Sequence, residues 1–158
     1  MESTNVKKVE EILISDKSIT NVAMVHSETT TGIFNPIDKI GALVRKHAPN
    51  ATFMVDAMSS FGGVPIDFEK CAIDFLVSSA NKCIEGVPGF SFVIANKEKL
   101  LRCDGWARSV SLDALAQYKG LEANGQFRFT PPTHTLMAFQ KAIQIQNEEG
   151  GVMARSQR

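Results

Sequence analysis

The sequence predicts an α/β fold with a mainly parallel sheet and flanking helices. Three short apolar runs are each followed at once by a polar cluster, and segments with helical spacing lie between them. Short strands that alternate with helices form doubly wound sheets, which bind ligands beyond the carboxyl ends of their strands. We therefore expect the polar clusters after Val25, Val55 and Val77 to lie along one edge of the sheet.

Apolar spacing and turn residues place the individual elements. Continuous apolar runs predict four strands, and the first is interpreted as buried because it is apolar nearly throughout. These strands span residues 21–25, 52–55, 74–77 and 90–95. Periodicity of about 3.6 residues predicts helices near residues 4–14, 36–48, 97–103, 111–122 and 133–148, with another beginning at Val152 after a Gly-Gly break.

Caps and buried faces follow from residue types. Asn35 is expected to cap the second helix with Pro36 in its first turn, and Ser111 is expected to cap the fourth. Apolar residues at helical spacing are expected to face inward. They are Leu112, Leu115 and Tyr118 in the fourth helix and Leu136, Phe139, Ile143 and Ile145 in the fifth.

Composition limits the classes of partner. The chain has 158 residues, 22% of them charged, with a net charge of zero, so charge gives no reason to expect nucleic acid or an anionic membrane as partner. Its three cysteines have no metal-like spacing, and we expect no metal site and a reducing compartment. No apolar run approaches the roughly 20 residues that span a bilayer.

One lysine and one aspartate suggest a cofactor. Lys82 follows an apolar run and stands among small residues, while Asp56 closes another apolar run. A lysine amine can form a Schiff base with the aldehyde of pyridoxal phosphate, and a carboxylate can keep the pyridine nitrogen protonated. The pair alone is a weak signal, because charged residues at strand ends are common.

Longer runs around these two residues resemble the 2-aminoethylphosphonate–pyruvate transaminase family. The resemblance covers about residues 19–158, in one order and without large gaps. Its motifs are His26–Gly32, Val55–Gly63, Ser78–Phe90, Ala107–Asp113 and Arg128–His134. This family belongs to the class V, fold-type I aminotransferases that depend on pyridoxal 5'-phosphate. The resemblance implies the central part of an aspartate aminotransferase-like large domain.

The resemblance also assigns roles. Lys82 is similar to the lysine that binds the cofactor and moves the substrate proton, and Asp56 to the partner of the ring nitrogen. Thr29 corresponds to the residue that hydrogen-bonds the ring hydroxyl. Thr130 corresponds to a threonine that reaches the cofactor phosphate of a second subunit, which implies a homodimer with a shared active site. Met58 is placed against one face of the ring, although plain core packing explains it equally well.

The implied reaction is the transamination of 2-aminoethylphosphonate with pyruvate to phosphonoacetaldehyde and L-alanine, in phosphonate catabolism. Two alternatives stay open: an alanine or serine–glyoxylate (pyruvate) aminotransferase of the same class, and a non-catalytic fragment. The chain is expected to be incomplete, with residues 1–150 as part of the large domain and 151–158 as the start of the connection to a small C-terminal domain. The expected compartment is the cytoplasm, with a mitochondrial location left open.

Four other residues have a plain explanation beside a functional one. His26 is interpreted as structural rather than as a partner of the site, and His134 as a residue at a helix start. Cys83 is interpreted as a small packing residue rather than a reactive thiol. Arg108 could bind a substrate anion or form a structural ion pair, and the sequence does not decide between them.

Overall fold

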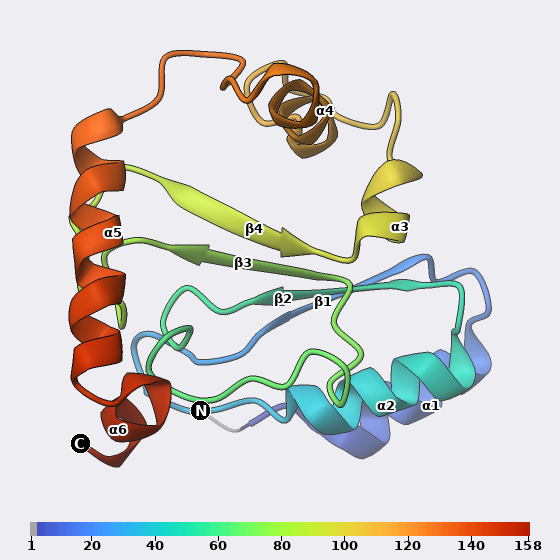
Figure 1. Cartoon of the computed structure of the whole chain (residues 1–158). Helices are drawn as coiled ribbons and strands as arrows, with labels where there is room; N and C mark the ends of the chain where they lie inside the picture. The colour runs from blue at the N-terminus through green and yellow to red at the C-terminus, as the bar shows by residue number, and fades with distance from the viewer. Residues whose placement is uncertain (1–2) are drawn as a thin grey trace.

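The computed structural model describes residues 3–158, which form one sheet with helices packed against it (Figure 1). Its strands lie in the order β1 (Asn21–Val25), β2 (Thr52–Asp56), β3 (Phe75–Ser79) and β4 (Ser91–Ala95). The first three are parallel, and β4 runs antiparallel to β3. The predicted α/β fold with a mainly parallel sheet is confirmed.

The register of the parallel strands aligns their carboxyl ends. Val25 of β1 pairs with Asp56 of β2, which in turn pairs with Val77 of β3. Backbone hydrogen bonds carry the pairing past the strand ends, from the His26 N–H to the Asp56 carbonyl (2.8 Å) and from the Ala57 N–H to the Val77 carbonyl (2.9 Å). The three polar segments therefore leave the sheet at the same edge, as the sequence predicts.

Each of the six helices that the sequence predicts is present, with starts shifted by up to three residues. They are α1 (Val6–Ser15), α2 (Ile37–His47), α3 (Lys97–Leu101), α4 (Ala114–Asn124), α5 (Thr133–Glu148) and α6 (Gly151–Gln157). In Figure 1, α1 and α2 lie side by side below the sheet, and α5 crosses the edge where β3 ends and β4 begins. No helix within residues 3–158 is both long enough and apolar enough to cross a membrane.

The core lies between this helix pair and the sheet. Its fully buried side chains include Leu13, Ile40, Phe53, Val55 and Leu76. The helix α2 comes so close to the loop before β3 that a Cβ on Gly41 would lie 1.8 Å from the Cys71 carbonyl oxygen. Glycine at this position lets the helix and the loop touch backbone to backbone.

Two predicted caps are wrong. Asn35 does not cap α2, whose N-cap is Pro36. The buried side chain of Asn35 instead accepts hydrogen bonds from the backbone and hydroxyl of Thr4 (3.0 and 2.9 Å) and donates one to the Val25 carbonyl (2.9 Å). It therefore ties the N-terminal segment to the end of β1. The helix α4 is capped by Asp113, which accepts from the Ala116 N–H, and not by Ser111.

Several predicted inward faces are also wrong. β1 is only half-buried, because it is the edge strand of this sheet. Leu112 precedes α4 and is 82% exposed. In α5 the side chains of Ile143 and Ile145 are exposed while Ala142 and Gln146 are buried. Phe139, which contacts Phe92 of β4 and Phe90 just before that strand, lies one turn before Ala142 and fixes that face of the helix inward.

Replacing Gly41 with alanine tests the contact between α2 and the Cys71 carbonyl. Alanine gains about 1 kcal/mol of helix propensity over glycine, but overpacking against backbone costs about 1–3 kcal/mol or more. We expect Gly41→Ala to lower the free energy of unfolding of the complete protein, measured by urea denaturation. Gly120→Ala in α4 is the matched control, because its Cβ would have no neighbour nearer than 3.5 Å. It should be neutral or stabilising, and equal effects of the two changes would contradict this packing argument.

Candidate active site

Three polar segments meet at the carboxyl edge of the sheet. The Lys82 amine, which follows β3, donates a hydrogen bond to the hydroxyl of Ser59 (3.0 Å), which follows β2. The same hydroxyl is 2.6 Å from the hydroxyl of Thr29, which follows β1. Ser59 therefore joins the predicted lysine and the predicted threonine into one chain of hydrogen bonds. All three side chains are at least partly open to solvent.

Asp56 stands beside this chain, at the last position of β2. Its Oδ1 accepts a hydrogen bond from the Met58 N–H at 2.9 Å, which folds the chain into a tight turn. The carboxylate is exposed, and the Met58 side chain is half-buried. Within the described residues Asp56 makes no ion pair with Lys82, so its charge stays open to a ligand above the edge.

Buried polar contacts support the edge from below. His26 is buried, and its Nδ1 lies 2.9 Å from the hydroxyl of the buried Ser60. The Ser78 hydroxyl donates to the Ala57 carbonyl (3.3 Å), which joins the segments that carry Lys82 and Asp56. Burial lowers the pKa of His26, since the charged imidazolium is disfavoured away from water. This geometry favours the structural interpretation of His26.

The remaining candidates lie apart from this cluster. Thr130 is exposed in the loop between α4 and α5, and among residues 3–158 no hydrogen bond connects it to the cluster. Arg108 and His134 are exposed as well. Cys83 is half-buried, and its thiol lies 3.4 Å from the Ser59 carbonyl, which suits a packing role.

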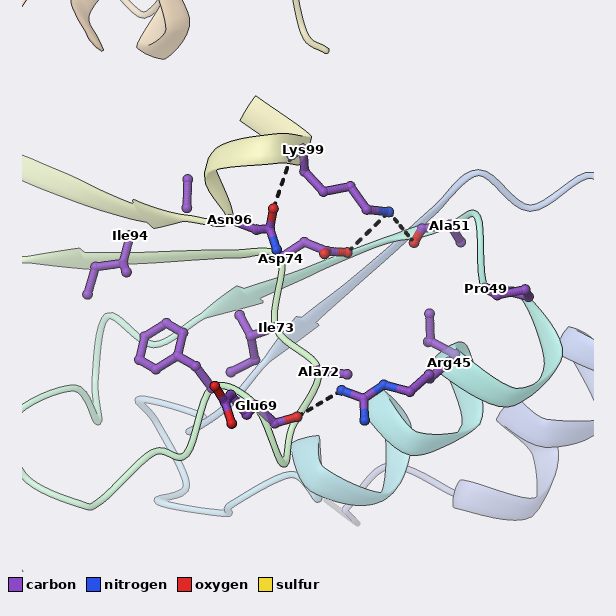
Figure 2. Close-up of a pocket in the computed structure, with 13 residues that line it drawn as sticks. Arg45, Pro49, Ala51, Glu69, Ala72, Ile73, Asp74, Ile94, Asn96 and Lys99 are labelled. Carbon is purple, nitrogen blue, oxygen red and sulfur yellow. Dashed lines mark hydrogen bonds and ion pairs between the residues drawn. The ribbon is translucent and has the colours of Figure 1, made fainter. Parts of the chain in front are cut away.

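A groove of about 630 Å³ opens at the opposite end of the sheet, between α2, α3 and the loop before β3 (Figure 2). Three of its charged groups already have partners in the protein. Lys99 contacts the Ala51 carbonyl (3.2 Å) and Asp74 (3.6 Å), and Arg45 donates to the Glu69 carbonyl (2.8 Å). Because these three groups are engaged within the protein and the groove is remote from Lys82, we do not place the active site there.

The comparisons with known proteins identify the family. The sequence matches the aminotransferase class-V family over residues 2–158. The chain belongs to this family. It is 56% identical over 155 residues to the 2-aminoethylphosphonate–pyruvate transaminase of Salmonella paratyphi C, and 55% identical to that of Salmonella typhimurium. These alignments cover 98% of this chain and 42% of the bacterial proteins. The chain thus spans less than half the length of the relatives that it matches.

Solved structures of class-V aminotransferases have the same fold. The pyridoxamine–pyruvate aminotransferase of Mesorhizobium loti superposes with a TM-score of 0.86 at 29% identity, over 98% of this chain and 39% of that one. The alanine–glyoxylate aminotransferase of Nostoc sp. gives a TM-score of 0.81 at 22% identity, over 99% of this chain and 41% of that one. The predicted aminotransferase-like α/β fold is therefore confirmed for this chain.

Membership of the class-V aminotransferase family implies pyridoxal phosphate as the cofactor, and the residues at the edge fit it. That group requires an amine for its aldehyde, an acid partner for its ring nitrogen and a polar partner for its ring hydroxyl. Lys82, Asp56 and Thr29 offer these three chemistries from neighbouring strand ends, and the carboxylate is accessible. Among the described residues no cluster of His, Cys, Asp and Glu is arranged to hold a metal ion.

Sequence reasoning missed Ser59 as the connecting residue. It stands in the quoted run from Val55 to Gly63, but Ser59 and Ser60 are adjacent and look alike in sequence. Only the structure shows that Ser59 faces Lys82 while Ser60 points inward to His26. The two adjacent hydroxyl side chains in this run were the only signal in the sequence, and they could not show which of the two serines contacts Lys82.

The depressed pKa of His26 predicts a pH dependence of stability. Because the unfolded chain binds a proton more readily than the folded one, the free energy of unfolding should fall as the pH drops below the ordinary histidine value of 6.5 and through the folded pKa. Urea denaturation of the complete protein between pH 7.5 and 5 measures this. His26→Gln, which keeps a polar partner for Ser60, should flatten the profile. Identical pH profiles for the two proteins would show that His26 does not carry the effect.

Removing the Ser59 hydroxyl should free the Lys82 amine. A hydrogen bond of this kind is worth about 1 kcal/mol, or roughly a factor of five. In the cofactor-free complete protein we therefore expect Ser59→Ala to raise the rate of Lys82 acetylation by acetic anhydride about fivefold, measured by mass spectrometry. Ser15→Ala, at the end of α1, is the control and should leave the rate unchanged. An unchanged rate in Ser59→Ala would mean that the hydrogen bond does not restrain the amine.

Proposed function

We propose that the protein containing this chain is a 2-aminoethylphosphonate–pyruvate transaminase, which forms phosphonoacetaldehyde and L-alanine in phosphonate catabolism. The supporting observation is the 56% identity to bacterial proteins of that name across 98% of the chain. The meeting of Lys82, Ser59 and Thr29 at one edge of the sheet adds geometric support. Since the chain spans 42% of those relatives, the activity is proposed for the whole protein.

In this proposal Lys82 is the catalytic residue. Bound pyridoxal phosphate supplies the electron sink that makes the substrate C–H bond acidic. The Lys82 amine takes the proton from the carbon that bears the substrate amino group, and returns a proton during the half-reaction with pyruvate. When the amine is free, the Ser59 hydroxyl lies within hydrogen-bond distance to hold it in place (3.0 Å).

Asp56, Thr29 and Met58 are proposed to hold the ring. The Asp56 carboxylate favours a protonated ring nitrogen, because a nearby negative charge stabilises the cation. Its turn with the Met58 N–H fixes the direction of that carboxylate, and places Met58 next to it along the edge. Thr29 offers its hydroxyl to the ring oxygen, with Ser59 as its second partner.

We further propose a homodimer in which Thr130 reaches the cofactor phosphate of the second subunit. Thr130 lies in an exposed loop, which is accessible to a second subunit. In the same loop, Arg128 donates a hydrogen bond to the Val110 carbonyl (2.9 Å), which joins the loop to the segment before α4. That segment presents bare apolar side chains, Trp106 (76% exposed) and Val110 (73%), which suit an interface. Residues 1–150 are proposed as part of the cofactor-binding large domain, and 151–158 as the start of the connection to a smaller one.

The deciding experiment uses the complete protein from the extended reading frame, loaded with pyridoxal phosphate. We expect a visible absorption band from the cofactor bound to lysine, and alanine formation from 2-aminoethylphosphonate and pyruvate. Lys82→Ala should abolish the band and slow the reaction by at least about 10²–10⁴-fold, the range for a lost acid–base group. Lys7→Ala, on the exposed side of α1, should change neither quantity.

Other outcomes would redirect the proposal. A protein that takes up the cofactor but transaminates only alanine or serine with glyoxylate would instead be the sister enzyme of the same class. Failure of the complete protein to bind the cofactor would contradict both enzymatic functions. A band that survives in Lys82→Ala would show that another lysine anchors the cofactor.

A further inference from the structure

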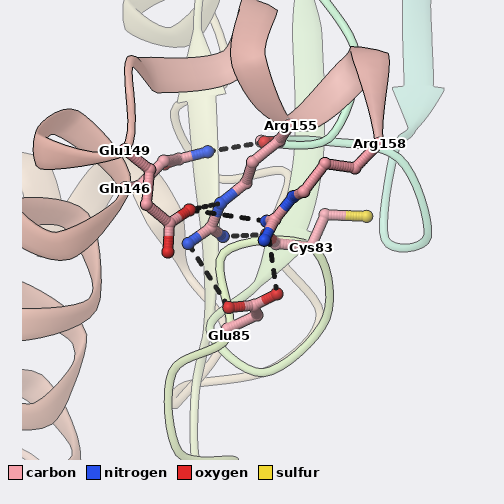
Figure 3. Close-up of polar contacts among 7 residues, drawn as sticks. Cys83, Glu85, Gln146, Glu149, Arg155 and Arg158 are labelled. Carbon is pink, nitrogen blue, oxygen red and sulfur yellow. Dashed lines mark hydrogen bonds and ion pairs between the residues drawn. The ribbon is translucent and has the colours of Figure 1, made fainter.

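A buried arginine contacts Cys83 and Glu85, in the turn that follows Lys82 (Figure 3). The side chain of Arg155, from α6, is only 5% exposed. Its guanidinium donates to the Cys83 carbonyl, which belongs to the residue after Lys82. It also contacts Glu85 (3.4 Å) and Glu149 (3.0 Å), so it joins the lysine turn to the corner between α5 and α6.

The lysine turn is also held from other sides, by the Cys83 thiol at 3.4 Å from the Ser59 carbonyl and by the buried side chain of Ile84. The Glu85 N–H donates to the Lys82 carbonyl (2.8 Å) and the Gly86 N–H to the Ala80 carbonyl (2.9 Å), so these two bonds are internal to the turn. Glu85 has a φ of 65°, in the left-handed region that non-glycine residues rarely adopt. A conformation of this kind persists where neighbouring contacts hold it, and the contact between Glu85 and Arg155 is one of them.

Burial makes these contacts specific. A charged group removed from water is costly unless its donors are satisfied and a counter-charge is close. Arg155 meets both needs with two carboxylates and one carbonyl, and only a planar guanidinium can reach three acceptors in a fixed fork. If this side chain is removed, the Cys83 carbonyl loses its guanidinium donor and Glu85 loses its buried partner.

The same corner also holds the neighbouring loop. The buried Gln146 side chain, from α5, donates to the carbonyl of Gly62 at 2.5 Å. Gly62 follows the segment that carries Asp56 and Ser59. The two helices therefore contact both loops whose side chains meet at the Lys82–Ser59 hydrogen bond.

We propose that Arg155 is a positioning residue for Lys82. It fixes the backbone of the lysine turn through the Cys83 carbonyl and the Glu85 carboxylate, and so keeps the amine in place over the edge of the sheet. The catalytic importance of this role rests on the proposed function of Lys82. The structural part, that Arg155 restrains the amine, does not depend on any cofactor.

The test compares Arg155→Gln with Glu149→Gln in the complete protein. Glu149→Gln removes the negative charge of one partner of the arginine at the end of α5 but leaves the contacts of Arg155 with the lysine turn, so it is the matched control for a weakened helix corner. In the cofactor-free proteins we expect Lys82 to be acetylated about fivefold faster in Arg155→Gln, as its hydrogen bond to Ser59 loosens. The rate should be unchanged in Glu149→Gln.

Two readouts with pyridoxal phosphate follow. A misplacement of about 1 Å can cost up to about 10²-fold in rate, so Arg155→Gln should slow the capture of the cofactor by as much. The visible circular dichroism per bound cofactor should also fall, because the chromophore is held less rigidly. Arg155→Lys keeps the positive charge but lacks the planar set of donors of the guanidinium, so it should give intermediate values. If Arg155→Gln does not fold, Arg155→Lys is compared with Glu149→Gln in its place.

Equal acetylation rates and equal dichroism in the Arg155 and Glu149 variants would overturn the proposal, since Arg155 would then only hold the helix corner. If the unaltered protein bound no cofactor, the proposed function would fail while the acetylation rates still decided the role of Arg155. The two failures are therefore distinguishable.

Discussion

Parallel pairing of β1, β2 and β3 is the constraint on which the rest of the structure depends. Parallel neighbours in register bring their carboxyl ends to one edge, so residues far apart in sequence become neighbours there. Thr29 and Ser59 are 30 positions apart and meet at 2.6 Å, and Ser59 and Lys82 are 23 apart and meet at 3.0 Å. The antiparallel strand β4 ends at the other edge, where the ion pair of Lys99 and Asp74 lies in the groove of Figure 2.

The fold and much of the edge could be predicted because the relevant signals are local. Continuous apolar runs fixed the strands to within two residues, as for Asn21–Val25, and glycine pairs and prolines separated the helices. The residues that leave the strands are contiguous with them, so predicting the strands also predicted that Asp56 and Lys82 share an edge. Their assigned chemical roles came from the resemblance, since two charges at strand ends have no unique meaning.

Apart from the cap of α4, which is Asp113 instead of the nearby Ser111, the failures discussed next concern contacts between distant segments. Asn35 has the residue type of a cap, but its side chain is used by Thr4, 31 positions away. The apolar residues of α5 fit more than one inward face, and Phe90, whose contact with Phe139 selects the face, lies 49 positions upstream, just before β4. Arg155 reaches the Cys83 carbonyl across 72 positions. No local pattern distinguishes such an arginine from an exposed one.

The polar groups of this structure fall into two layers with different tasks. Beneath the edge, His26, Ser60, Gln146 and Arg155 are buried, and their hydrogen bonds go to backbone, to one another and, for Arg155, to Glu149. Above it, Asp56, Thr29 and Lys82 are exposed and hold few bonds of their own. Buried polar groups are costly to move because each lost bond leaves an unsatisfied partner, whereas exposed groups exchange partners with water at little cost. The lower layer can therefore hold the loops rigid while the upper layer stays free to change partners, as the proposed role of Lys82 in binding the cofactor requires.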